Sequence, residues 1–250
     1  MMKRAIVRPP SKSYRKCISS HPLHHTLDFN LALEQHRKYC STLSELGLEV
    51  IRLPPEDDYP DSCFVEDTVI LHGNKAAIAR PAKKSRQGEE TSIEEVLKDY
   101  KQILRIEAPG TIEGGDVIHL EDSLISGLTQ RTNSDGIYQT ASWLGVKIDV
   151  IEDSSIVHLK SYVTFVGGDT IVTTKHFVEH PLLSDYSKII IPEHEAYAAN
   201  TLTCNGSVLV PAMHLDSIQL LKDAGFDVIP LDVSEFEKCE GALTCLSIIF

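Results

Sequence analysis

The chain has 250 residues, of which 42% are hydrophobic and 24% charged, with 14 glycines and 12 prolines. This composition is typical of a folded globular protein and excludes disordered, collagenous and coiled-coil classes. Acidic residues outnumber basic residues 36 to 24, and no run rich in lysine and arginine is present, so nucleic acid is a poor partner. No apolar stretch reaches the roughly 20 residues of a membrane helix, and residues 1–9 resemble a strand more than a signal peptide. We therefore expect a cytoplasmic protein with no membrane partner.

The cysteines and histidines show no pattern of a cofactor or metal site. Six cysteines are scattered without a C-x-x-C or Cys/His ligand spacing, at positions 17, 40, 63, 204, 239 and 245. A chain of this length does not need covalent cross-links to fold, so we expect neither disulfides nor structural zinc. The 11 histidines include no H-E-x-x-H motif and no i, i+4 pair on a predicted helix.

The first elements in the chain are a strand, a helix and a second strand. Residues 3–9 and 48–53 are short β-branched runs that predict strands. Between them, apolar residues recur at helical spacing from Phe29 to Leu46. Asp28 is a suitable N-cap, and Gly47 stands where a C-terminal glycine ends many helices.

The same order of elements then recurs along the chain. Aliphatic runs flank four predicted hairpin turns at Gly73-Asn74, Glu121-Asp122, Gly167-Gly168-Asp169 and Asn205-Gly206. The turns lie about 40 to 50 residues apart, a spacing that indicates internal repeats. Helical patterns follow the first, second and fourth turns, at residues 93–103, 134–144 and 215–224. With the terminal strand 246–250 paired to the first strand, the pattern predicts one α/β domain, residues 1–250, of about five modules.

Four clusters could carry chemistry, and each also has a plainer interpretation. Residues 60–67 place three carboxylates before an apolar strand, and alone they would suggest a solvated loop. In residues 111–116, two glycines could direct Glu113 and Asp116 from a strand mouth, or form an ordinary turn.

The other two clusters each contain one reactive side chain. His158 lies within a predicted aliphatic strand, where a histidine is more often a hydrogen-bonded core residue than a catalyst. Cys245 follows a glycine-containing loop. A buried, inert thiol is the default interpretation, but a neighbouring histidine or cation would make it a nucleophile.

Taken together and in this order, the motifs resemble the dimethylarginine dimethylaminohydrolase family, within the guanidine-modifying superfamily that includes arginine deiminases. The resemblance spans nearly the whole chain and is carried by eight motifs: Ala32-Leu33-Glu34-Gln35-His36, Phe64-Val65-Glu66-Asp67, Arg80-Pro81 with Ser85-Arg86, Ile106-Glu107-Ala108-Pro109-Gly110-Thr111, Arg131-Thr132-Asn133, Val157-His158-Leu159-Lys160, Tyr197-Ala198-Ala199-Asn200 and Cys245. It implies the pentein fold, a five-bladed ββαβ propeller with the substrate in a central cavity.

The resemblance also implies how an N-methylated arginine would be hydrolysed to citrulline and an alkylamine. Cys245 would attack the guanidinium carbon and form a thiouronium adduct. His158 would protonate the departing amine and then activate water. Glu113 would hydrogen-bond His158 and orient it. Asp67 and Glu66 would bind the planar cation through charge-assisted hydrogen bonds. No cofactor or metal is implied, because side chains supply both nucleophile and proton carrier.

The rest of the substrate would be held by four further residues. Arg86 and Arg131 resemble the pair that binds the α-carboxylate, and Asp61 resembles the residue near the α-amino group. Ile18 stands where the family has a hydrophobic residue in a mobile lid loop, although residues 22–27 depart from the family's loop sequence.

Other functions remain open at this point. Arginine deiminases use the same nucleophile and histidine, but they typically have an acidic residue two positions after the histidine, where this chain has Lys160. Ribosome anti-association factors share the fold without the catalytic pair, and an arginine-binding relative could keep the cavity alone. The expected partner is a small-molecule substrate. Relatives are often homodimers, so a homodimer is a further expectation.

Overall fold

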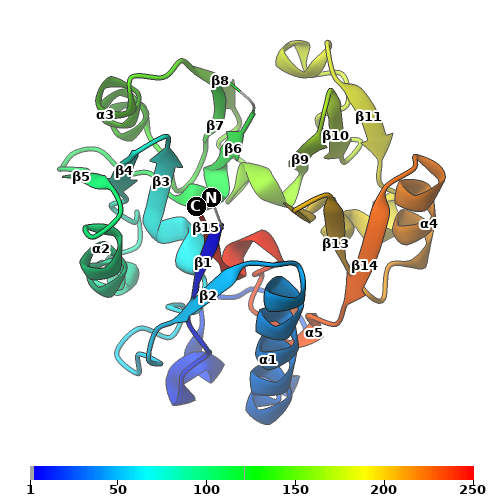
Figure 1. The fold of residues 1–250 in the computed structure, drawn as a ribbon, viewed down its shortest axis with the longest axis horizontal. Coiled ribbons are helices and arrows are strands. Elements are labelled where there is room, and N and C mark those ends of the chain that lie inside the picture. The colour runs from blue at the N-terminus through cyan, green and yellow to red at the C-terminus, as the bar shows by residue number, and fades with distance from the viewer. Residues whose placement is uncertain (1–2, 121) are drawn as a thin grey trace.

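The computed structural model describes residues 3–120 and 122–250, and they form five three-stranded sheets arranged around a central axis (Figure 1). In every sheet the middle strand pairs antiparallel with one neighbour and parallel with the other. The sheets are β15-β1-β2 (Ile248–Ile249, Arg4–Val7, Glu49–Arg52), β3-β4-β5 (Val69–His72, Lys75–Ile78, Gln102–Arg105), β6-β7-β8 (Val117–His119, Leu124–Leu128, Ile148–Glu152), β9-β10-β11 (Val163–Gly167, Thr170–Thr173, Ser187–Ile190) and β12-β13-β14 (Leu202–Cys204, Ser207–Pro211, Asp227–Leu231). The predicted five-bladed arrangement is confirmed.

One sheet is built from both ends of the chain. Ala5 pairs with Ile249 and Ile6 with Ile248, antiparallel, while β1 pairs in parallel with β2. Figure 1 shows β1 and β15 near the axis. This pairing closes the ring, as the sequence predicted.

Helices cross from the middle to the outer strand of four blades. They are α1 (Phe29–Glu45), α2 (Thr91–Leu97), α3 (Ser134–Leu144) and α4 (Leu215–Asp223), with a short α5 (Ser234–Glu237) after the last blade. Asp28 caps α1 by accepting from the Asn30 and Leu31 N–H groups, and Gly47 takes a φ of +86°. These two features confirm the predicted ends of the first helix.

One local prediction was wrong, and another lies partly outside the described residues. The helix predicted over 93–103 ends at Leu97, because Ile103 is needed on the sheet opposite Ala76. The β9-β10-β11 blade, for which no helix was predicted, crosses through a short 3₁₀ turn, η7 (Pro181–Leu183). β6 and β7 form the predicted hairpin, but Glu121 of its turn lies outside the described residues.

The apolar core is divided among neighbouring blades, and the axis is left polar. Ile70, Ala77, Val117 and Ile137, for example, form a buried cluster that joins the second and third sheets with α3. Other clusters join the remaining neighbours around the ring. Charged and hydroxyl side chains can therefore gather at the centre without interrupting hydrophobic packing.

Five 3₁₀ turns lead into the inner strands of the five blades. They are η3 (Val65–Thr68), η5 (Gly114–Asp116), η6 (Leu159–Ser161), η8 (Glu193–Ala199) and η9 (Thr244–Leu246). Four of the five neighbouring pairs of turns pack against one another, and Asn200, which follows η8, accepts from the Thr244 N–H of η9. The repeat thus brings turns that are far apart in the sequence together at the centre of the ring.

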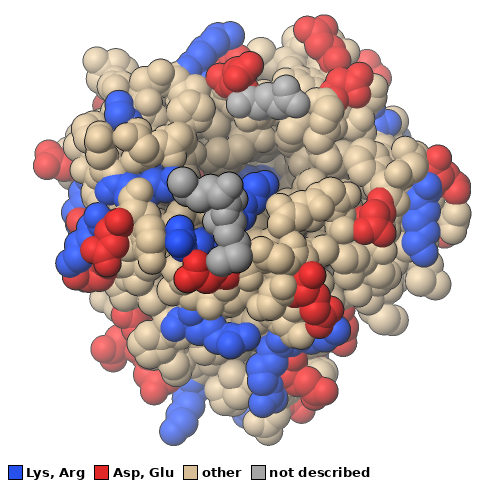
Figure 2. All heavy atoms as spheres, in the orientation of Figure 1, with Lys and Arg blue, Asp and Glu red and all other residues tan. Residues whose placement is uncertain are grey.

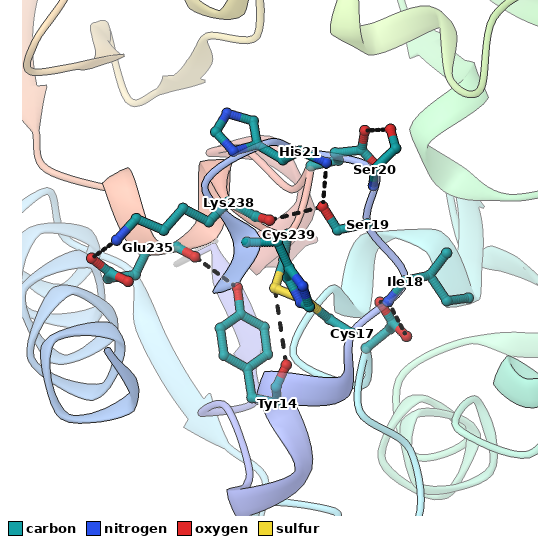
Figure 3. The surroundings of a disulfide bond; sticks show 12 residues. Tyr14, Cys17, Ile18, Ser19, Ser20, His21, Glu235, Lys238 and Cys239 are labelled. Carbon is teal, nitrogen blue, oxygen red and sulfur yellow. Dashed lines mark hydrogen bonds and ion pairs between the residues drawn. A yellow bond between two sulfur atoms is a disulfide. The ribbon is translucent and has the colours of Figure 1, made fainter. Parts of the chain in front are cut away.

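The expectation of no disulfide is wrong. Cys17 and Cys239, separated by 222 residues in the sequence, form a disulfide with their Cα atoms 6.0 Å apart (Figure 3). Cys17 follows η1 (Lys12–Lys16), and Cys239 follows α5. Sequence spacing could not reveal the pair, because only the closing of the ring brings these segments together.

None of the helices described is both long and apolar enough to cross a membrane.

Candidate active site

A cavity of about 250 Å³ brings together seven of the nine predicted site residues. They come from the start of the chain, the central turns and the last blade. The seven are Ile18, Asp61, Asp67, Arg86, Arg131, His158 and Cys245. Glu113 lies directly behind His158, and Glu66 faces elsewhere.

His158 and Glu113 form the closest polar pair of the site. His158 Nε2 lies 2.7 Å from Glu113 Oε2 and 3.8 Å from Asp67 Oδ1. Burial disfavours the imidazolium, but Asp67 and the hydrogen bond to Glu113 outweigh it and raise the pKa of His158 to about 9. His158 is therefore protonated near neutral pH. It caps η6 and does not lie within a strand, so that part of the prediction was wrong.

Close approach of these side chains depends on a glycine. A Cβ atom at Gly115 would lie 2.8 Å from Asp67 Oδ1 and 2.9 Å from His158 Cγ. The Gly115 N–H also donates to Asp67 Oδ1 at 3.0 Å. The paired glycines noted in the sequence therefore let η5 pack directly against the reactive groups.

Glu113 is fully buried and links several site residues. It accepts from the Ala82 N–H at 3.1 Å, and Arg86 and Arg131 lie 3.6 Å and 3.5 Å from its oxygens. Burial opposes its ionisation, but His158 and Arg86 prevail and lower the pKa of Glu113. A buried carboxylate in this setting can fix the orientation of the imidazole and hold its proton.

Asp67 offers a permanent negative charge on the cavity wall. Arg86 Nη1 donates to Asp67 Oδ2 at 2.8 Å. Despite burial, His158 and Arg86 lower the pKa of Asp67 to about 2. The carboxylate is thus ionised over the whole physiological range and can bind a cation.

Cys245 lies in η9, buried at the cavity wall, with 8% of its surface exposed. Burial, together with the carboxylates of Asp67 and Glu66, raises the pKa of its thiol far above the ordinary value. In the free protein it is therefore a thiol, and a positive ligand near Asp67 would reduce the cost of ionising it.

The Glu66 side chain does not line this cavity. Its oxygens accept from Lys160 Nζ and Thr244 Oγ1, both at 2.6 Å. These three residues border a second cavity, of about 610 Å³. Figure 2 shows a central hollow with basic side chains around it, and Lys3, Lys101 and Lys160 line this cavity. Lys160 therefore does not face the site that contains His158.

The two predicted clamp arginines differ in how freely they can bind a ligand. Arg86 is buried and donates to Asp67, Glu89 and the Phe64 carbonyl. Among the described residues, the one ion-pair partner of Arg131 is Glu113, at 3.5 Å. Arg131 is thus the more available guanidinium, while Arg86 also supports the carboxylates beneath it.

Asp61 and Ile18 connect the cavity to the N-terminal loop. The Ile18 N–H donates to Asp61 at 3.1 Å, and the Asp61 side chain is buried. Burial raises the pKa of Asp61, although Arg86 partly opposes the shift. The loop backbone therefore positions a carboxylate at the cavity wall.

Asn200 and Asp116 support the site, although neither was among the predicted site residues. The Asn200 amide accepts from the Thr244 N–H at 3.0 Å and donates to Thr244 Oγ1 and the Lys160 carbonyl. Asp116 accepts from the Leu159 N–H at 2.9 Å. Sequence analysis noted Asn200 only as part of a motif and Asp116 only as part of a cluster, because their supporting roles depend on contacts between turns.

Asp67, Glu113 and His158 are close enough to one another to hold a metal ion. Arg86, however, already pairs with Asp67 and lies beside Glu113, so a cationic side chain occupies this carboxylate cluster. The geometry suits ion pairs and proton transfer better than metal binding, and the absence of a cofactor stays a prediction.

Comparison with known proteins finds one consistent likeness. Residues 19–248 match the family described as "N,N dimethylarginine dimethylhydrolase, eukaryotic". The chain is 35% identical to the N(G),N(G)-dimethylarginine dimethylaminohydrolase of Pseudomonas aeruginosa, with 100% of both chains covered. It is 34% identical to the protein of the same name from Streptomyces coelicolor, over 98% of this chain and 96% of that one.

Solved structures agree with the sequence comparison. A cysteine-to-serine mutant of the Pseudomonas aeruginosa protein, complexed with citrulline, matches with a TM-score of 0.96 at 34% identity over 100% of both chains. A dimethylarginine dimethylaminohydrolase adduct with S-methyl-L-thiocitrulline matches with the same score, identity and coverage.

Proposed function

Because the chain belongs to the dimethylarginine dimethylaminohydrolase family, we propose that it hydrolyses N-methylated arginine to citrulline and an alkylamine. Asymmetric dimethylarginine and monomethylarginine are the substrates. One observation supports this best: Cys245, the His158–Glu113 pair, Asp67 and two arginines surround a single cavity of about 250 Å³. One bound methylarginine molecule could thus contact a nucleophile, a proton carrier, a cation site and an anion site at the same time.

The first step needs a thiolate. Asp67 binds the substrate guanidinium, and the arriving positive charge offsets the carboxylates that keep Cys245 protonated. The Cys245 thiol then gives its proton to solvent water, because His158 is already protonated, and the thiolate sulfur attacks the guanidinium carbon. Substrate binding thereby activates the nucleophile.

His158 begins this cycle as the acid. Its pKa of about 9 means that it carries a proton near pH 7 and can deliver it to the departing alkylamine. The bond from carbon to the alkylamine nitrogen breaks, which leaves a thiouronium linked to Cys245. The neutral imidazole then takes a proton from water, which attacks the same carbon, and citrulline leaves as the sulfur is released.

The α-carboxylate and α-amino group position the substrate. Arg131, assisted by Arg86, binds the carboxylate through charge-assisted hydrogen bonds, and Asp61 lies within the same cavity for the amine. Ile18 contributes an apolar wall from the N-terminal loop. Glu66 acts indirectly, because its ion pair with Lys160 holds η3 and η6 behind Asp67 and His158.

Selectivity against arginine does not come from Lys160 as a residue of the cavity wall, since its ammonium lies in the second cavity. The Lys160–Glu66 pair instead keeps the Glu66 carboxylate away from the substrate. Asp67 is then the ionised acid facing the guanidinium, and a methylated guanidinium needs fewer acceptors than arginine.

Citrulline formation from asymmetric dimethylarginine, monomethylarginine and arginine tests the proposal. We expect kcat/KM for a methylated substrate to exceed that for arginine by at least about tenfold. Mass spectrometry of acid-quenched reactions should show an adduct on the peptide containing Cys245. Equal or better use of arginine would assign the chain to the deiminase reaction, and no turnover of any of the three would contradict the enzyme proposal.

The proposal extends to the whole chain as one catalytic domain, residues 1–250. We also expect it to act in the cytoplasm and to form a homodimer. Fractionation and light scattering test these two expectations.

A further inference from the structure

Cys17, His24 and Cys239 form a compact cluster outside the catalytic residues. Their ligand atoms all lie within 4.8 Å of one another, and Cys17 Sγ is 3.3 Å from His24 Nε2. The two sulfurs are joined as a disulfide, and Figure 3 shows it between the N-terminal loop and the segment after α5. His24 begins the short turn η2 (His24–Thr26) and approaches from the solvent side.

The donor set is one that zinc prefers. Two thiolates and an imidazole are common zinc ligands, with Zn–S bonds of about 2.3 Å and Zn–N bonds of about 2.0 Å. Tetrahedral angles then place sulfur and nitrogen about 3.5 Å apart and the two sulfurs about 3.8 Å apart. The observed 3.3 Å between Cys17 Sγ and His24 Nε2 is close to the first value. Breaking the disulfide would let the two sulfurs move apart toward the distance of about 3.8 Å that zinc requires.

The cluster differs from the other two groups of potential ligands in the described residues. One is the catalytic group, where Arg86 pairs with the carboxylates. In the other, Glu195 already accepts from the Ser217 N–H and hydroxyl, and His194 and Asp216 are exposed. Only 5% of Cys17 and 3% of Cys239 is exposed, so these sulfurs are shielded from solvent.

We propose that Cys17, His24 and Cys239 form a redox-gated zinc site. A dithiol reductant donates two electrons and two protons to the Cys17–Cys239 disulfide and is itself oxidised to a disulfide. One Zn²⁺ then binds both sulfurs and His24 Nε2 and displaces the two thiol protons. A water molecule completes the tetrahedron on the solvent side. In a reducing compartment, where disulfides are rare, zinc takes the place of the covalent bond.

The site lies where a cross-link holds the loop over the active cavity. Cys17 precedes Ile18, and both Ile18 and Cys239 line that cavity. The contacts beside the disulfide are hydrogen bonds from Ser19 Oγ to the Lys238 carbonyl and from Ser20 to the Glu240 carboxylate (Figure 3 labels Ser19, Ser20 and Lys238). The disulfide and the metal therefore join the same two segments, whereas the free dithiol leaves hydrogen bonds and apolar packing between them.

Cobalt binding tests the site without relying on catalysis. The full chain carrying Cys245→Ser, which removes the catalytic thiol as a ligand, is reduced with a phosphine, freed of reductant and titrated with Co²⁺ and then Zn²⁺. We expect one Co²⁺ per chain, a thiolate-to-cobalt charge-transfer band, and loss of that band as zinc displaces cobalt. The oxidised protein should show no band.

Single substitutions in this background identify the ligands. Cys17→Ser or Cys239→Ser should abolish the band, and His24→Ala should weaken binding at least tenfold. His24→Cys should restore it with a stronger band. Cys204→Ser and His25→Ala are matched controls that should leave it unchanged. Circular dichroism verifies that each variant is folded.

A band that persists in folded Cys17→Ser or Cys239→Ser protein would overturn the proposal. So would a reduced protein that shows free thiols at both positions but binds no cobalt. Because Cys245→Ser is used throughout, the result does not depend on whether the chain hydrolyses methylarginine.

Discussion

Lys160 and Glu66 form an ion pair, with Nζ and Oε1 2.6 Å apart, behind Asp67 and His158. Glu66 precedes Asp67 in η3, and Lys160 lies two residues after His158 in η6. Burial raises the pKa of Glu66, and Lys160 is the main group that opposes the shift. The pair therefore connects η3, which contains Asp67, with η6, which His158 caps.

Replacing Lys160 with Met should destabilise the protein by about 3–5 kcal/mol, because it leaves the Glu66 carboxylate buried without its cation. Glu66→Gln in the same chain removes the unpaired charge, so the double variant should recover much of the loss. Urea unfolding of the two single variants and the double variant measures the coupling. Equal stability of Lys160→Met and the unmodified protein would contradict the role of the pair.

Cys245→Ser should lower turnover of asymmetric dimethylarginine at least a hundredfold while substrate binding persists, because a hydroxyl ionises far less readily than a thiol. Calorimetry measures binding, and citrulline formation measures turnover. Cys204→Ser, which alters a buried free cysteine outside the cavity, is the control and should retain activity. More than a few per cent of activity in Cys245→Ser would exclude Cys245 as the nucleophile.

Glu113→Gln should lower the pKa of His158 from about 9 toward its ordinary value of 6.5, because it removes a carboxylate that favours the imidazolium. NMR titration of the histidine in Cys245→Ser protein measures the shift. Glu107→Gln, at an exposed position, should leave it unchanged. An unaltered His158 titration in Glu113→Gln would show that the pair is not coupled.

The same shift predicts how stability depends on pH. The folded-state pKa of His158 lies above its unfolded value, so its contribution is complete below pH 6.5 and is lost as pH rises toward about 9. Unfolding free energies measured from pH 6 to 10 should fall over this interval. This decrease in the free energy of unfolding should be smaller in Glu113→Gln. The same pH dependence in both proteins would contradict its attribution to the His158–Glu113 pair.

Arg131→Ala should raise KM for methylated arginine tens- to a hundredfold, with a smaller change in kcat, because it removes about 2–3 kcal/mol of charge-assisted binding. Agmatine, which lacks the α-carboxylate, should be a poor substrate of the unmodified enzyme. Efficient agmatine turnover would contradict the carboxylate clamp.

Arg86→Ala should affect stability as well as substrate binding, because it leaves the buried carboxylates of Asp67 and Glu89 without their cation. We expect a lower melting temperature in addition to a raised KM, whereas Arg131→Ala should melt near the unmodified protein. Steady-state kinetics and calorimetric melting of the two variants separate binding from structural support.

The sequence predicted the repeat because its signals are local. Asp28 and Gly47 mark the ends of α1, and glycine-containing turns mark three of the hairpins. Helix α3 coincides with its predicted range of 134–144. The apolar spacing of 93–103 was misleading, because parallel pairing of Ile103 with Ala76 outweighs its helical periodicity.

The site was less predictable, because it depends on the directions in which side chains point and on contacts that form when the ring closes. Successive side chains of a 3₁₀ turn point to different sides, so Asp67 lines the active cavity while Glu66 lines the other. The disulfide joins positions 17 and 239, and Asn200 joins η6 to η9. None of these relationships follows from the spacing of residues along one segment.

The shared blade of β1 and β15 has a topological consequence. Arg4 and Phe250 exchange two backbone hydrogen bonds, N to O at 2.7 Å and 2.9 Å, so the described chain is nearly a closed loop that happens to be open at this point (Figure 1). The other four blades have covalent hairpins at the equivalent place. A circular permutant that joins the present ends by a short linker and opens at Gly167-Gly168 would keep every blade intact. Cys245 would then lie in the interior of the polypeptide, and His158 would lie near the new C-terminus.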